Sequence, residues 1–126
     1  RCMKIVSTTN APAAIGPYSQ AIVVNDMVFT SGQIALKPDG SFLEGDVEAQ
    51  ATQVLENLQA VLAEAGSSLQ KVVKTTIFLA NMDDFAKVNS VYGSFFGEHK
   101  PARSTVGVKT LPRNALVEIE AIAVVE

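Results

Sequence analysis

The chain has 126 residues, of which 48% are hydrophobic, and this length suits one domain with a single core. Its formal net charge is −3 at pH 7, and its lysines and arginines are scattered rather than gathered into a basic stripe. This distribution disfavours nucleic acid as a partner. The longest apolar runs, such as residues 121–125, are far shorter than the roughly 18 residues of a transmembrane helix. We therefore expect one soluble domain over residues 1–126, with no membrane partner.

The number of cysteines indicates whether the protein works in a reducing or an oxidising compartment. Cys2 is the only cysteine, so the chain can form no intramolecular disulfide and offers no zinc-binding cysteine cluster. This predicts a metal-free fold in a reducing compartment, either the cytoplasm or the mitochondrial matrix. The chain starts with Arg1 rather than methionine, which fits either a removed presequence or a cloning linker, and the sequence leaves both origins open.

The N-terminal third predicts strands. Residues 19–24 and 27–34 are rich in Val, Ile and Phe and flank the turn-forming pair Asn25-Asp26, which indicates a β-hairpin. A short strand near residues 4–6 precedes them. Residues 37–40, Lys-Pro-Asp-Gly, then interrupt the chain with residue types that favour turns.

Helices and strands alternate in the rest of the chain. Between residues 47 and 65, apolar side chains recur every three or four positions, which predicts a helix capped by Asp46 and ended by Gly66. Residues 72–79 predict a strand, and residues 85–96 predict a second amphipathic helix. Residues 103–108 and 116–125 predict two closing strands, with residues 111–114 in the connection between them.

The predicted order of elements is β-β-β-α-β-α-β-β. Two helices, each with one apolar stripe, together with five or six strands predict an α+β fold with both helices on one face of a mixed sheet. The other sheet face is then uncovered. Copies of the same chain could bury it, so we expect a closed symmetric oligomer, whose order this argument leaves open.

The last predicted strand places two acidic residues on an apolar face. Alternation puts Glu118 and Glu120 on the same side as Ile122 and Val124, with the two acids roughly 6.5–7 Å apart. A desolvated, unpaired carboxylate costs several kcal/mol, so each acid should reach solvent or meet a cation. The pattern is consistent with a strand at the rim of the sheet whose two carboxylates are solvated, and equally with a catalytic pair of carboxylates.

Three other positions are candidates for a site. Arg103 begins a predicted strand, and its planar guanidinium could hold a substrate carboxylate, pair with Glu118 or Glu120, or form an ordinary surface ion pair. Tyr18 lies where a loop enters a strand. Gly32, after Ser31, interrupts a strand and predicts a β-bulge or a close approach by another group. Tyr18 and Gly32 could equally be structural.

Other catalytic motifs do not occur in the sequence. His99 is the only histidine, no motif supplies it with triad partners, and we assign it no role. The chain contains no GxGxxG, Walker loop or HExxH sequence. The sequence therefore gives no support for dinucleotide binding, nucleotide binding or zinc-protease activity.

Five segments together carry a resemblance to a known family. They are AAIGPYSQ at 13–20, TSGQI at 30–34, VN at 88–89, PARS at 101–104 and EIEAIA at 118–123. In order and spacing, over nearly the whole chain, they resemble the reactive intermediate deaminase (Rid, or YjgF-like) family. The chain departs from many members at Thr105, where they carry cysteine, and residues 99–101 form a shorter loop than in some bacterial members.

The resemblance implies a chorismate-mutase-like α+β fold and a homotrimer with clefts between its subunits. It further implies hydrolysis of 2-iminobutanoate and 2-iminopropanoate to 2-keto acids and ammonia without a cofactor, which protects pyridoxal-phosphate enzymes from these imines. By position, the carboxylate-binding arginine is Arg103 and the water-positioning glutamate is Glu118. The implied substrate-binding residues are Tyr18, Ser31, Gly32, Asn89 and Thr105, with main-chain contacts at Gly32 and Thr105. A non-catalytic regulatory trimer that binds small carboxylates and a ribonuclease remain alternatives.

Overall fold

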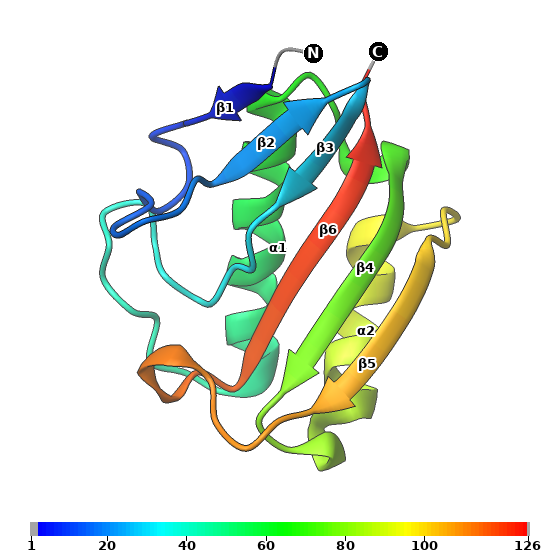
Figure 1. Cartoon of the computed structure of the whole chain (residues 1–126). Coiled ribbons are helices and arrows are strands. Elements are labelled where there is room, and N and C mark those ends of the chain that lie inside the picture. The colour runs from blue at the N-terminus through cyan, green and yellow to red at the C-terminus, as the bar shows by residue number, and fades with distance from the viewer. Residues whose placement is uncertain (1–2, 126) are drawn as a thin grey trace.

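Six strands form one mixed sheet in the computed structural model, which describes residues 3–125 (Figure 1). The strands are β1 (Lys4–Val6), β2 (Ala21–Val24), β3 (Met27–Thr30), β4 (Val72–Leu79), β5 (Ala102–Gly107) and β6 (Val117–Val124). They lie in the order β1-β2-β3-β6-β4-β5. Neighbours are antiparallel, except that β4 and β5 run parallel and are joined through a helix. Cys2 lies outside the described residues.

The β2–β3 hairpin forms where the sequence predicts it. Val24 pairs with Met27, and Asn25 and Asp26 between them adopt φ values of 51° and 63°. A two-residue turn with positive φ at both positions matches the twist of its strands, and Asn and Asp tolerate this conformation better than most residues. Both strands are shorter than expected, because β2 begins at Ala21 and β3 ends at Thr30.

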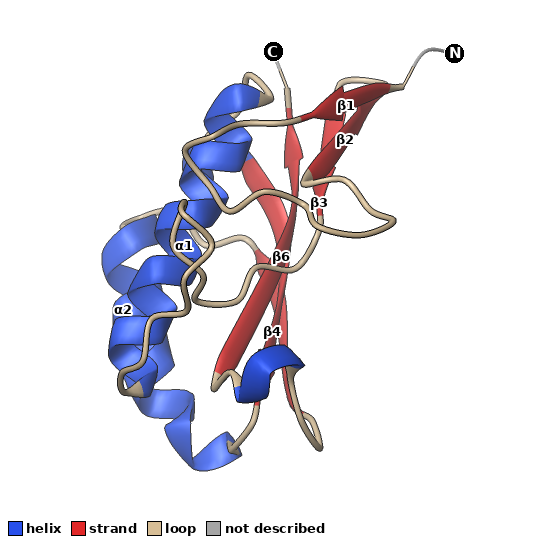
Figure 2. Ribbon diagram, turned by 90° about the vertical axis from the view of Figure 1, so that its left-hand side faces the viewer, coloured by secondary structure: helices blue, strands red, loops and turns tan. Residues whose placement is uncertain are grey.

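Both helices cover the same sheet face (Figure 2). Helix α1 (Val47–Glu64) begins where the carboxylate of Asp46 accepts a hydrogen bond from the amide of Ala49 at 2.8 Å, and Gly66 follows its end with φ 85°. Helix α2 (Phe85–Phe96) connects β4 to β5. In the described part of the chain, three short 3-10 helices lie between these elements: η1 (Leu69–Lys71), η2 (Met82–Asp84) and η3 (Pro112–Asn114). None of the helices in residues 3–125 has the length and apolar character needed to cross a bilayer.

The core lies between the helices and the sheet. Alternate residues of β6 are buried there, and the apolar stripe of α1 packs against the same layer. On the opposite face, cross-strand pairs align Ile5, Ile22, Phe29 and Ile122 in one row across four strands. Ile5 is 67% exposed and Phe29 is 43% exposed. Helices α1 and α2 both lie on the other side of the sheet (Figure 2). The predicted α+β class, the element order and the uncovered face are all confirmed.

Candidate functional site

Glu118 faces a pocket on the side of the sheet that the helices leave open. The pocket has a volume of about 600 Å³, and its wall includes Tyr18, Ser31, Gly32 and Glu118. The loop before β2, the segment after β3, helix η3 and strand β6 together form this wall. Four of the seven residues that the sequence proposes for the site therefore share one cavity, which we call the glutamate pocket.

A β-bulge brings Gly32 to this pocket. Phe29 pairs with Ile122 and Gln33 bridges to Ile119, so that residues 30–32 stand opposite only Glu120 and Ala121. The hydroxyl of Thr30 accepts a hydrogen bond from the amide of Ala121 at 3.0 Å and occupies that donor within the bulge. The bulge predicted from Gly32 is confirmed, and its effect is to redirect the chain toward Glu118.

The carboxylate of Glu118 lies directly against the backbone of Gly32. A Cβ atom at position 32 would overlap the carboxylate oxygen and come within 2.9 Å of Cδ of Glu118. Glycine at position 32 is therefore required for the present position of the Glu118 side chain, which is the group that approaches it closely.

We expect Gly32→Ala to displace the Glu118 side chain rather than to unfold the protein, because the end of that side chain is free to rotate away. Turnover should fall by about tenfold or more, since a shift of about 1 Å in a catalytic group can cost up to 100-fold. Thermal unfolding should change by only a few degrees. A Gly32→Ala variant with wild-type turnover would contradict a catalytic position for the Glu118 carboxylate.

Burial raises the pKa of Glu118 above its ordinary value, and the negative charge of neighbouring Glu120 raises it further. A raised pKa brings a carboxylate closer to the range in which it exchanges protons efficiently near neutral pH. Because the folded state favours the protonated acid, this group makes the protein less stable as pH rises from the ordinary pKa through the raised one. If the ionised carboxylate of Glu118 is needed for turnover, the reaction rate should increase as the pH rises through the raised pKa of Glu118.

Glu120→Gln tests this electrostatic coupling. Removing the neighbouring negative charge should shift the acid limb of the pH–rate profile to lower pH, because burial alone then raises the pKa of Glu118. The plateau rate should stay close to that of the wild type, since Glu120 is exposed on the sheet face. An unmoved acid limb in a folded Glu120→Gln protein would show that the limb does not report Glu118.

Ser31 and Gln20 hold the loop that forms the pocket wall. The Ser31 hydroxyl donates to the carbonyl of Ser19 at 2.6 Å, and the buried Gln20 amide donates to the carbonyl of Pro12 at 2.8 Å. Ser31 thus positions the bulge, while Tyr18, which is 54% exposed, is available to a ligand. Nothing in the sequence pattern distinguishes Gln20 from other polar residues of this loop.

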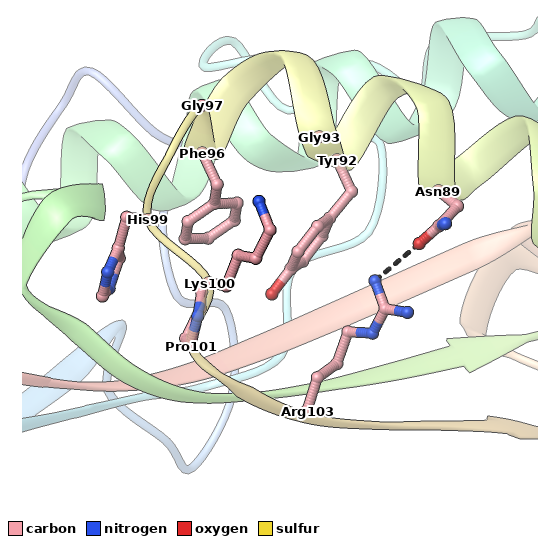
Figure 3. Close-up of a pocket in the computed structure, with 9 residues that line it drawn as sticks. All are labelled: Asn89, Tyr92, Gly93, Phe96, Gly97, His99, Lys100, Pro101 and Arg103. Carbon is pink, nitrogen blue, oxygen red and sulfur yellow. Dashed lines mark hydrogen bonds between the residues drawn. The ribbon is translucent and has the colours of Figure 1, made fainter.

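Arg103 lies in a second pocket, between α2 and the edge strand β5 (Figure 3). Its guanidinium donates to the side-chain oxygen of Asn89 at 2.7 Å and lies 5.0 Å from the ring centroid of Tyr92. The hydroxyl of Tyr92 shares a buried hydrogen bond of 2.7 Å with Thr75. Asn89 and Tyr92 therefore fix the orientation of the guanidinium in this arginine pocket, whose volume is about 470 Å³.

His99 and Thr105 have supporting positions near Arg103. The imidazole of His99 makes a 2.6 Å hydrogen bond with the carbonyl of Val72, which ties the loop after α2 to the start of β4. The Thr105 hydroxyl is buried and has no hydrogen-bond partner within residues 3–125. It lines neither pocket, so its main chain, on the outer strand of the sheet, is the part that a ligand could reach.

The two pockets lie on opposite faces of the sheet. Arg103 is in register with buried Thr75 beneath α2, whereas Glu118 is in register with Phe78 on the open face. Strand β4 also separates β5 from β6. The alternative in which Arg103 pairs with Glu118 or Glu120 is therefore wrong within one chain. Among residues 3–125, no group of three His, Cys, Asp or Glu side chains is placed to hold a metal ion.

Sequence comparisons identify close relatives. The sequence model of the family described as endoribonuclease L-PSP matches residues 8–125. A RutC family protein of Synechocystis is 56% identical, and the match covers 97% of this chain and 96% of that protein. The 2-iminobutanoate/2-iminopropanoate deaminase of Salmonella typhimurium is 50% identical, with 96% and 97% covered. AldR of Lactococcus lactis, named as a regulator, is 50% identical, with 98% and 99% covered.

The fold agrees with these matches. The crystal structure of TdcF from E. coli with bound serine superposes with a TM-score of 0.92 at 46% identity, and the match covers 98% of this chain and 99% of that one. A Yersinia pestis protein described as a member of the Rid family superposes with a TM-score of 0.96 at 51% identity, with 98% and 100% covered. The chain therefore belongs to the endoribonuclease L-PSP family, the YjgF-like or Rid family that its five sequence segments resemble.

Proposed function

We propose that the protein hydrolyses small 2-imino acids, such as 2-iminobutanoate and 2-iminopropanoate, to 2-keto acids and ammonia. The observation that carries this proposal is the half-buried carboxylate of Glu118, which is held against Gly32 in an open pocket and whose pKa is raised by burial. Such a group is suited to accept a proton from water near neutral pH. The name of the Salmonella relative and the serine bound to TdcF are consistent with a small amino-acid-like ligand.

The proposed chemistry needs only orientation and proton transfer. Arg103 holds the substrate carboxylate through two parallel hydrogen bonds, and Glu118 orients a water molecule toward the imine carbon and accepts its proton. The water oxygen forms a bond to this carbon. The nitrogen, which enters as the protonated imine, takes up the proton from Glu118 and leaves as ammonia when the C–N bond breaks. The new hydroxyl group loses its remaining proton to Glu118, which releases it to solvent, and this oxygen becomes the carbonyl of the 2-keto acid.

The proposed site requires two copies of the chain. Because Arg103 and Glu118 of one chain lie on opposite sheet faces, a cleft that contains both is formed when the arginine pocket of one subunit meets the glutamate pocket of another. Contacts between two different surfaces are heterologous, and they form a ring when the rotation between successive subunits closes. Together with the family resemblance, this supports a homotrimer with three sites, and light scattering should give a mass near three times 13.4 kDa.

Two rival functions are favoured by the names of relatives. A regulator would bind small carboxylates through Arg103 without turnover, as the name of the Lactococcus relative suggests. A ribonuclease, suggested by the family description, would need to bind a polyanion, which the net charge of −3 disfavours. A regulator would not turn over an imine, whereas the proposed deaminase would. A ribonuclease would cleave RNA, which the proposed deaminase would not.

The direct test is ammonia release from a freshly generated 2-imino acid, with wild type and Arg103→Ala compared side by side. The wild type should accelerate release above the spontaneous rate, and Arg103→Ala should lose most of that acceleration while remaining folded. A wild-type protein that binds 2-oxobutanoate without accelerating hydrolysis would favour the regulatory function.

A further inference from the structure

Helix η3 holds two successive residues in the left-handed conformation. Arg113 has φ 61° and ψ 20°, and Asn114 has φ 55°. Asparagine visits this region readily, but for arginine it costs on the order of 1 kcal/mol. Glycine at position 113 would avoid that cost, and strained conformations of this kind cluster at functional sites. The conformation therefore directs attention to what the Arg113 side chain does.

The guanidinium of Arg113 is held in place by an aromatic ring. It lies 5.5 Å from the ring centroid of Phe42, a partly buried side chain packed against the core. This cation–π contact fixes the charge but leaves the N–H donors in the guanidinium plane free. Within residues 3–125, Arg113 forms no ion pair with a carboxylate, so its donors remain available to a ligand.

Arg113 shares the glutamate pocket with Tyr18, Gly32 and Glu118. It is the only lysine or arginine among the described residues lining that pocket, and Glu118 is the only acid there. Within residues 3–125 no ion pair joins the two, and the charge that acts on the pKa of Glu118 is that of Glu120 rather than of Arg113. A ligand in this pocket thus meets a base at one wall and a free cation at another.

We propose that Arg113 is a specificity residue, which binds a second, distal carboxylate and so admits 2-imino dicarboxylates to the pocket. This inference rests on the proposed deaminase function, in which Arg103 of another subunit holds the first carboxylate. A free guanidinium with a planar pair of donors matches a carboxylate. Arg113 and Glu118 come from different elements of the pocket wall, helix η3 and strand β6, so one ligand can contact both.

The test compares two substrates that share a five-carbon chain and differ at its end, where 2-iminoglutarate carries a carboxylate and 2-iminopentanoate carries a methyl group. Each is generated by an amino-acid oxidase with catalase, and kcat/KM is measured for the full-length protein. Arg113→Gln should lower the value for 2-iminoglutarate by about tenfold or more and leave 2-iminopentanoate within about twofold. Lys109→Gln is the matched control, because this exposed lysine lies in the same connection and does not line the pocket.

A second variant separates ligand binding from folding. Arg113→Gly relieves the left-handed conformation but loses the contact with Phe42, so its thermal stability should stay within a few degrees of the wild type, while the loss for 2-iminoglutarate should persist. An equal loss for both substrates would overturn the proposal, because Arg113 would then act on the shared part of the substrate or on the loop. No loss for either substrate would also overturn it.

Binding by calorimetry keeps this inference distinguishable from the proposed function. The wild type should bind 2-oxoglutarate more tightly than 2-oxopentanoate, and Arg113→Gln should abolish that preference. If the wild type turns over neither imine but shows the preference, the deaminase function fails and the anion site stands. If it turns over both imines and shows no preference, the anion site fails and the deaminase function stands.

Discussion

Glu118→Gln is expected to lower the turnover number by about 100-fold or more, which is typical for the loss of a positioned general base. Glutamine has nearly the same shape and keeps one acceptor oxygen, but its amide nitrogen donates hydrogen bonds and it cannot accept the proton of the attacking water. The glutamate pocket should keep its form, because the amide occupies the same space against Gly32. Affinity for the 2-keto acid product should therefore stay within a few-fold of the wild type, as measured by calorimetry alongside single-turnover kinetics.

Glu120→Gln is the control for this substitution, since it makes the same chemical change two residues along the same strand face. If Glu120→Gln is the inactive protein and Glu118→Gln the active one, the assignment of the two acids is wrong.

Arg103→Lys is expected to lower kcat/KM by about 100-fold, although the positive charge is kept. A lysine ammonium cannot reproduce the planar, two-donor grip on a carboxylate, nor stack flat over an aromatic ring. In the present geometry Asn89 accepts one guanidinium N–H, and the guanidinium lies 5.0 Å from the ring centroid of Tyr92 (Figure 3). The loss should fall mainly on binding of the carboxylate, and folding should be unaffected.

Lys100→Gln provides the comparison for general electrostatics, because this exposed lysine lines the same pocket. It should reduce kcat/KM far less than Arg103→Lys. Similar losses in the two variants would mean that Arg103 contributes only to the overall positive charge of the pocket.

Local signals predicted much of the fold and part of the site. The turn pair Asn25-Asp26 and the cap Asp46 act within a few residues of themselves, so the sequence pattern sufficed for the hairpin and for α1. Gly32 was informative for the same reason, since a glycine inside a strand signals a bulge or a close contact. The sequence did not reveal that the close contact was the carboxylate of Glu118.

Long-range arrangement could not be predicted in the same way. Whether Arg103 faces Glu118 depends on β4 lying between β5 and β6 and on the register of both pairs, and neither is encoded by local spacing. Gln20 and Arg113 were missed because glutamine and arginine carry no turn signal, and their roles arise from partners far away in the chain.

The most direct test of the account is complementation between two inactive variants, Arg103→Ala and Glu118→Gln, co-expressed with different tags and purified as mixed trimers. An intact site forms wherever a subunit that keeps Arg103 meets one that keeps Glu118. In a trimer that contains both variants, one of the three sites is intact, so ammonia release should recover to about one third of the wild-type rate. Mixed trimers that stay as inactive as either parent would contradict an imine-hydrolysing site shared between subunits.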